Sequence, residues 1–410
     1  MSRDQSPSVS RAPVPGGAPL ATVLSLPGLR TVRSPGFRRL VAATLCLTGA
    51  VVLALLLVHQ ASDPAGQYGI DFSDYQLAAQ RMAAGASPYA AALLQGPITA
   101  QGVDVYRYPP LFAQLLLPLA NAPFGVAATI WLLLQAAAAF AAVWIAAGLG
   151  GARRSLERAL WCAAAAIWFL PVFDSLWKGN VSDILALQVA LLGAGGLAGG
   201  AAMATAVLLK VVPVALLPAI VRGPRRALIT AAAVGGVLLA VSVLAAPGAW
   251  LDYARVLPNL AAGSADDSTN LAPWALVARL GVPALATVAR LASILLAGAC
   301  VVAAWRVARR APAAAVALTT IAMLLLPAAL WYHYLAVLLP QAALAWPRAT
   351  GRARAALAGC AALISLGIAW LPLATLGAAA LATVLVAVLL SGATSPCLAA
   401  PTRRAPRVPA

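Results

Sequence analysis

A short run of acids and aromatic residues follows the first long apolar segment of the chain, in Asp71-Phe-Ser-Asp-Tyr75. Burial beside apolar surface disfavours the charged form of a carboxylate and makes it a stronger base. Asp71 is therefore a candidate general base. Apolar spacing predicts an amphipathic helix over 71–84, lying on a membrane surface. Asp71 and Asp74 then fall in its first turn, where negative charge is favoured, and this structural explanation is the stronger one for Asp74.

Three cationic or titratable side chains accompany these acids. Lys178 and Lys210 are the only lysines, and His333 is one of two histidines. Lys210 lies inside an apolar run, where an ionisable group is expensive and functional by default, and an ammonium binds phosphate as a point charge. His333, in Trp331-Tyr-His-Tyr334, is suited to bind or protonate a leaving phosphate. Snorkelling of Lys210 and aromatic anchoring at the membrane surface are the structural alternatives.

Other candidates are polar residues at the ends of apolar segments. Arg107 and Tyr108 precede two prolines, Asn180 follows Gly179 in a predicted turn, and Asn270 ends an acidic loop. The adjacent acids in that loop lack further ligands and are weak evidence for a metal. We predict neither a metal site nor a cofactor, because fixed cations can stabilise a leaving anion.

The elements that position these residues are helices in a membrane. Hydrophobic residues make up 62% of the chain, mean hydropathy is +0.90 and charged residues are 10%, against about 25% charged in soluble domains. With about 20 residues per span, we expect an all-α bundle of about twelve spans. The candidates, with a helical hairpin broken near Lys210 and Pro213, are 40–58, 124–149, 159–173, 182–197, 198–210, 211–222, 225–247, 283–305, 312–330, 334–347, 355–371 and 372–391.

The arginines set the expected orientation. They lie mostly in short loops between apolar runs, as the positive-inside rule requires, so the net charge of +17 does not indicate nucleic-acid binding. Alternate threading places both termini in the cytoplasm and leaves 108–121, at ~14 residues too short for a span, as an interfacial or re-entrant helix.

Apart from Asp71 and Asp74, the acids on the predicted outer side are interpreted mostly as solvated loop residues: Asp63, Asp104, Asp174, Asp183, Asp252, Asp266 and Asp267.

The chain ends differ in composition from its centre. Residues 1–39 are rich in Pro, Ser, Gly and Arg and predict a disordered basic cytoplasmic tail. A second basic, Pro-rich cytoplasmic tail is expected over 392–410, and 40–391 form one transmembrane domain. The segment 40–58 is interpreted as a retained signal anchor.

The order and spacing of these motifs, from about residue 40 to 390, resemble glycosyltransferase family 87. These are membrane transferases of the GT-C superfamily that resemble polyprenyl-phosphate-mannose-dependent mannosyltransferases. Asp74 departs from the family pattern, in which that position is usually apolar, and Lys178 precedes Gly179-Asn180 where Gly-Gln-x-Asn is more usual. The matching features are Asp71-Phe-x-x-Tyr75 with Gly85 and Tyr89, Tyr108-Pro-Pro-Leu111 with Pro118, Gly179-Asn180, Lys210 with Pro213, Asn270 and Trp331-x-His-Tyr334.

The resemblance implies a GT-C-like fold and transfer with inversion, on the outer face of the bacterial plasma membrane. We expect a hexose, with mannose favoured, to pass from a polyprenyl-phosphate donor to a glycolipid or polysaccharide hydroxyl. The family's catalytic aspartate maps onto Asp71 and its histidine onto His333. Substrate binding is expected from Tyr75, Arg107, Tyr108, Lys178, Asn180, Lys210 and Asn270.

Two other functions compete with this expectation. A transporter or flippase of lipid-linked sugars would use charges at the membrane midplane, broken helices and often internal repeats, yet no repeat is visible and the spans are nearly free of charge apart from Lys210. A surface-polysaccharide polymerase or ligase would share the lipid-linked donor but favour outer-loop Arg over Asp.

Overall fold

The chain is helical throughout the residues that the computed structural model describes, 34–62, 68–96, 105–263 and 268–391, and these contain no strand. Helix α2 (Pro35–Ser62) begins inside the segment predicted as a disordered tail. Its first turn is anchored by an ion pair of 2.9 Å between Arg38 Nε and Glu157 Oε1. Asp63, Asp104, Asp266, Asp267 and most of both predicted tails lie outside the described residues.

The all-helical membrane class is confirmed, whereas the count of about twelve spans stays a prediction. Within the described ranges, five helices are long and apolar enough to cross a membrane. A sixth span is possible if α8 (Leu156–Trp168) and α9 (Leu170–Lys178), which meet at 65°, act as one. The five are α2, α7 (Phe124–Leu149), α13 (Arg225–Ala245), α16 (Pro283–Val307) and α20 (Leu371–Ser391).

Several predicted spans are shorter helices. At 1.5 Å per residue, 13 or 14 residues reach about 20 Å, below the ~30 Å hydrocarbon core. Gly195 separates α10 from α11, and Lys210 ends α11 in an extended conformation, so the predicted break near Lys210 is present. These shorter helices are α10 (Ser182–Ala194), α11 (Gly196–Leu209), η2 (Val212–Leu216) with α12 (Leu217–Val221), and α17 (Pro312–Leu325).

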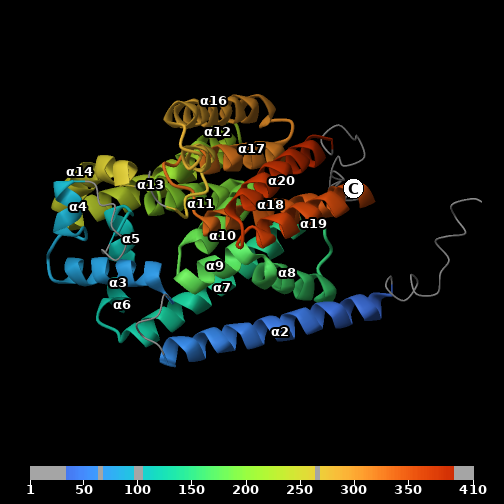
Figure 1. Ribbon diagram of the computed structural model, residues 1–410, viewed down its shortest axis with the longest axis horizontal. Coiled ribbons are helices and arrows are strands. Elements are labelled where there is room, and N and C mark those ends of the chain that lie inside the picture. Colours follow the sequence, from blue (N-terminus) through green and yellow to red (C-terminus); the bar gives the residue numbers. More distant parts are fainter. Residues whose placement is uncertain (1–33, 63–67, 97–104, 264–267, 392–410) are drawn as a thin grey trace, which may run out of the picture.

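The first predicted outer loop folds into short helices that gather at one end of the molecule, away from the start of α2 and the end of α20 (Figure 1). The helix predicted over 71–84 is α3 (Ile70–Ala83). The apolar run 108–121 forms two helices too short to cross a membrane. The loop helices are α3, α4 (Ala91–Gln95), α5 (Pro110–Leu115) and α6 (Leu117–Ala120); α14 (Pro247–Gly263) packs against α4, and α15 (Pro273–Ala278) follows it.

Helix α7 is a central packing element and also contacts the loop helix α3. It packs against α10 and against α18 (Leu338–Ala345), and α10 and α9 both pack against η3 (Tyr332–Val337). Trp331-Tyr-His-Tyr334 therefore meets the α9–α10 junction, although the two segments are far apart in sequence. The elements of this C-terminal part are η3 (Tyr332–Val337), α18 (Leu338–Ala345), η4 (Trp346–Arg348) and α19 (Gly351–Leu366).

Segments predicted to share the inner side lie together. Besides the Arg38–Glu157 pair, Arg348 Nη2 donates to the Leu149 carbonyl over 2.9 Å, and the Arg222 guanidinium lies 4.7 Å from the Trp305 ring centroid. The orientation of the chain in the membrane stays a prediction.

Helices α11 and α13 are held close by a glycine. A Cβ added at Gly200 would meet the Ala227 carbonyl oxygen and come within 2.7 Å of Thr230 Cβ. We expect Gly200→Ala to destabilise the protein by about 1–3 kcal/mol through overpacking. Gly236→Ala on α13, where a Cβ meets nothing within 4 Å, is the control and should be neutral or slightly stabilising. Thermal unfolding in detergent measures both, and equal midpoints would contradict this account of the packing.

Candidate active site

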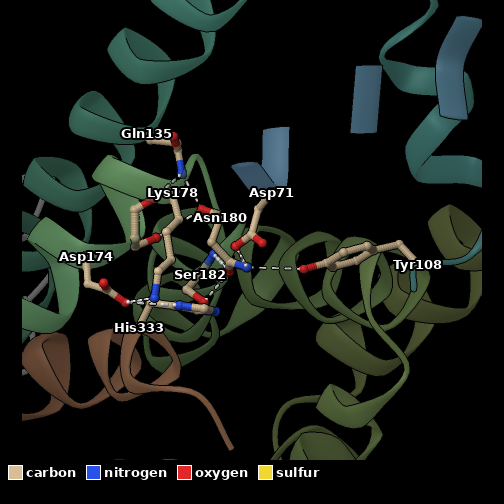
Figure 2. A network of polar contacts seen from close by, with 9 residues as sticks. Asp71, Tyr108, Gln135, Asp174, Lys178, Asn180, Ser182 and His333 are labelled. Atoms are coloured by element: carbon tan, nitrogen blue, oxygen red, sulfur yellow. Dashed lines mark hydrogen bonds and ion pairs between the residues drawn. The ribbon is translucent and has the colours of Figure 1, made fainter. Parts of the chain in front are cut away.

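Asp71 and Asn180 form the centre of the polar network in Figure 2. Asn180 Nδ2 donates to Asp71 Oδ2 over 2.8 Å. Asp71 lies in the first turn of α3, two residues after Gly69, whose N–H donates to the Trp177 carbonyl over 2.9 Å. Asn180 follows the end of α9 and is buried. The start of α3 and the end of α9 thus bring together residues 109 positions apart.

Gly179 permits this approach. Its φ of +71° ends α9 in the left-handed region that glycine adopts readily. A Cβ at this position would lie 2.7 Å from Phe72 Cβ on α3. Trp131 Nε1 of α7 donates to the Gly179 carbonyl over 2.7 Å, which fixes the turn against the central helix.

The Asn180 amide has a defined orientation. Ser182 donates to Asn180 Oδ1 from its backbone N–H over 3.0 Å and from its hydroxyl over 2.7 Å. Two donors on one oxygen leave the amide nitrogen to donate toward Asp71. Ser175 Oγ donates to the Asn180 carbonyl over 3.0 Å, and Gln135 Nε2 donates to the same oxygen.

Two tyrosines extend the network away from Asp71. Tyr75 OH donates to Tyr108 OH over 2.8 Å, and Asn180 Nδ2 lies 3.4 Å from the same oxygen. Burial, followed by the charge of Asp71, raises the pKa of Tyr108; burial, followed by Tyr108 and Asp71, raises the pKa of Tyr75. Both phenols therefore stay protonated near neutral pH.

Asp74 has a different environment from Asp71. It lies in the second turn of α3, not in the first as predicted, because the helix begins at Ile70. Its Oδ2 accepts from the Val105 N–H over 3.4 Å, so it ties α3 to the segment that leads into Arg107 and Tyr108.

Lys210 and Arg107 bring positive charge to aromatic surfaces nearby. Lys210 Nζ lies 3.3 Å from the Tyr334 ring centroid and 5.7 Å from that of Tyr108. The Arg107 guanidinium lies 4.6 Å from the Trp331 ring centroid.

An open hollow with an empty volume of about 310 Å³ adjoins Lys210. Its wall is mostly apolar and includes Ser182, Lys210, Pro213, Met323 and Tyr334. Lys210 and Ser182, the serine that orients Asn180, therefore line the same hollow.

His333 and Lys178 meet on one carboxylate. Asp174 Oδ2 lies 3.2 Å from His333 Nδ1 and 3.1 Å from Lys178 Nζ. The prediction of a solvated loop is wrong for Asp174, which lies within α9, for Asp183, which is fully buried in the first turn of α10, and for Asp252, which lies within α14. These acids were misplaced because the loops predicted between spans are themselves mostly helix.

Asn270 supports the motif that carries His333. Its Nδ2 donates to the Ala328 carbonyl over 3.0 Å, and its Oδ1 accepts from the N–H groups of Leu330 and Ala272 over 3.0 and 2.9 Å. These bonds hold the backbone directly before Trp331. The predicted contact of Asn270 with substrate stays a prediction.

Gln135, Asp174 and Ser182 are among the network members that were not singled out from sequence. Gln135 is an amide within the apolar α7 segment, and such a residue signals a buried polar function. Asp174 lies four residues before Lys178, a spacing that pairs charges on a helix. Ser182 carries no comparable signal.

Comparison with protein-family models identifies a family for this chain. A sequence model described as Glycosyltransferase family 87 matches residues 106–330, more than half of the 410 residues. The matched region contains Tyr108, Asn180 and Lys210. No curated protein matches the chain.

The glycine requirement at position 179 is directly testable. We expect Gly179→Ala to lower stability more than Gly85→Ala does, because Gly85 has a similar φ of +75° but open space around a Cβ. Both variants carry the same backbone strain, so the difference between their stabilities measures the steric overlap at position 179, about 1–3 kcal/mol. Thermal melts in detergent provide the comparison, and a Gly85→Ala variant as unstable as Gly179→Ala would refute the steric explanation.

Proposed function

Since the chain belongs to glycosyltransferase family 87, and is therefore an enzyme, we propose that it transfers a hexose from a polyprenyl-phosphate donor to a glycolipid or polysaccharide hydroxyl. Mannose is the sugar that we favour. Family membership decides for a transferase over the transporter alternative. The observation that carries the proposal is a carboxylate, Asp71, held by Asn180 next to Tyr108, whose ring centroid lies 5.7 Å from Lys210 Nζ.

Asp71 is the proposed general base. Asn180 occupies Oδ2, and no described residue hydrogen-bonds to Oδ1, which leaves that oxygen for an acceptor hydroxyl. As the hydroxyl oxygen attacks the anomeric carbon, its proton passes to Asp71. The bond from that carbon to the phosphate oxygen breaks, and polyprenyl phosphate leaves with the electron pair. A single displacement of this kind inverts the anomeric configuration.

Lys210 is the first choice to stabilise the leaving phosphate. Its ammonium lines the hollow and is not hydrogen-bonded to any described residue, so its three N–H groups are open to an anion. His333, Lys178 and Arg107 follow in that order. A cation in place before reaction stabilises developing negative charge without reorganisation.

We place this site on the outer face of a bacterial plasma membrane, with both termini cytoplasmic. Support comes from the distribution of Arg and from the contacts among the predicted inner segments. The loop helices around Asp71 also lie at the end opposite the start of α2 and the end of α20 (Figure 1). The polyprenyl chain would lie among the apolar helices, which makes the lipid bilayer part of the substrate site.

Asp71→Asn tests the base. We expect transfer from polyprenyl-phosphate mannose in membrane vesicles to fall by about 10²–10⁴-fold, the usual contribution of a general base. Asp74→Asn is the control on the same helix and should retain activity within a few-fold. Transfer by Asp71→Asn at the wild-type rate would remove Asp71 from the mechanism.

Lys210→Gln tests the phosphate contact. The variant should weaken use of the donor by about 10–100-fold, since a hydrogen bond to a charged group contributes about 1.5–3 kcal/mol. Arg290→Gln is the control, because the Arg290 guanidinium also lies over an aromatic ring, 5.4 Å from the Trp274 centroid, but outside this network. Initial rates against donor concentration measure the effect, and matching rates in both variants would dismiss Lys210 as a phosphate ligand.

A further inference from the structure

We propose that Asp174 is a positioning residue that holds the His333 ring with Nδ1 protonated and Nε2 directed to the leaving phosphate. The proposal deepens the proposed function and rests on it. Asp174 Oδ2 lies 3.2 Å from His333 Nδ1, although the two residues are 159 positions apart. Figure 2 shows Asp174 and Lys178, both from α9, meeting His333 from η3.

The carboxylate fixes the proton position on the ring. An ionised carboxylate only accepts hydrogen bonds, so Nδ1 must carry the hydrogen that points to it. The side chains of Asp174 and His333 are only 12% and 4% exposed. Water therefore offers little competition for this bond.

Two aromatic neighbours fix the plane of the ring. Trp331 stacks on it with 6.4 Å between centroids and 17° between planes, and Tyr334 meets it edge-on at 4.9 Å and 73°. Tyr334 also carries Lys210 on its ring. The imidazole and the ammonium proposed to bind phosphate are thus placed by one shared tyrosine.

His333 Nε2 is the atom left for a ligand. It is buried, and no described residue hydrogen-bonds to it. Buried polar atoms of this kind are few in folded proteins and each requires an explanation. A phosphate oxygen in the neighbouring site supplies the missing partner.

The charges around His333 favour an anion there. Lys178 shares the Asp174 carboxylate and balances its charge. When both ring nitrogens carry hydrogen, the three residues together bear one net positive charge. In the reaction, Nε2–H donates a hydrogen bond to the phosphate oxygen whose bond to the anomeric carbon breaks; no bond to nitrogen forms.

The competing role of Asp174 is purely structural, as an ion pair that joins α9 to η3. Ring ¹⁵N NMR of His333 distinguishes the two roles, because the chain has only two histidines and a His59→Gln variant assigns the signals. We expect Nδ1 to be protonated in the wild type, and the neutral ring of folded Asp174→Asn to shift toward the Nε2–H form. The same ring pattern in both proteins would overturn the proposal.

The rate of sugar transfer provides a second test of the positioning role of Asp174. We expect Asp174→Asn to lower kcat by about 10–100-fold, the size of effect seen when a metal-binding histidine loses its orienting partner, and to have less than about a two-fold effect in a His333→Gln background. Asp252→Asn is the control, since that carboxylate forms a comparable pair with Arg255 at 3.3 Å, and its rate should be unchanged. Equal losses from Asp174→Asn in the two backgrounds would overturn the positioning role.

The two proposals fail in different ways. If the wild-type protein transfers no sugar from any polyprenyl-phosphate donor, the proposed function is lost. The ring spectrum still decides whether Asp174 sets the proton position of His333, because it needs no substrate.

Discussion

The close approach of α3 to the end of α9 is the constraint on which the site depends. Gly179 makes it possible, because any side chain there would overlap Phe72. The Gly69 N–H and the Trp177 carbonyl join the same two elements. The hydrogen bond from Asn180 to Asp71 follows from this geometry. Packing therefore settles the position of the proposed base before any substrate binds.

The charged side chains around this contact are stabilised in two ways. Asp174 is compensated by partners within hydrogen-bond distance, Lys178 and His333. Lys210 instead lies over the Tyr334 ring, where a cation is attracted without being neutralised. A site of low dielectric strengthens both kinds of interaction. The aromatic surfaces keep positive charge available for an anion close to Asp71.

Composition and local spacing predict part of this structure. Helical periodicity located α3, and the prolines and shortness of 108–121 indicated that it does not cross. The predicted turn at Gly179 and the predicted helix break near Lys210 are both present, because each is encoded by the residues at that position. The pairing of Asp174 with His333 was not predictable, since it joins residues 159 apart through tertiary packing. The burial of Asp183 was missed because a polar residue between two apolar runs has the pattern of a loop.

The predicted number of membrane spans was limited in the same way, because helix ends depend on more than hydropathy. Hydropathy marks α10 and α11 as apolar, but it does not show that each ends after 13 or 14 residues. Those ends depend on Gly195 and on the turn at Lys210, and the second of these brings a cation to the site. The turn at Lys210, which ends α11 too early for a full span, thus also places a cation in the proposed site.

The most direct test of the central claim, that Asp71 acts as a base in a single displacement, is the anomeric configuration of the product. Purified protein would be given polyprenyl-phosphate mannose of known configuration with a membrane glycolipid extract as acceptor, and the new linkage would be read by NMR. The account predicts the configuration opposite to that of the donor. A retained configuration would contradict it, because it would require two displacements at the anomeric carbon.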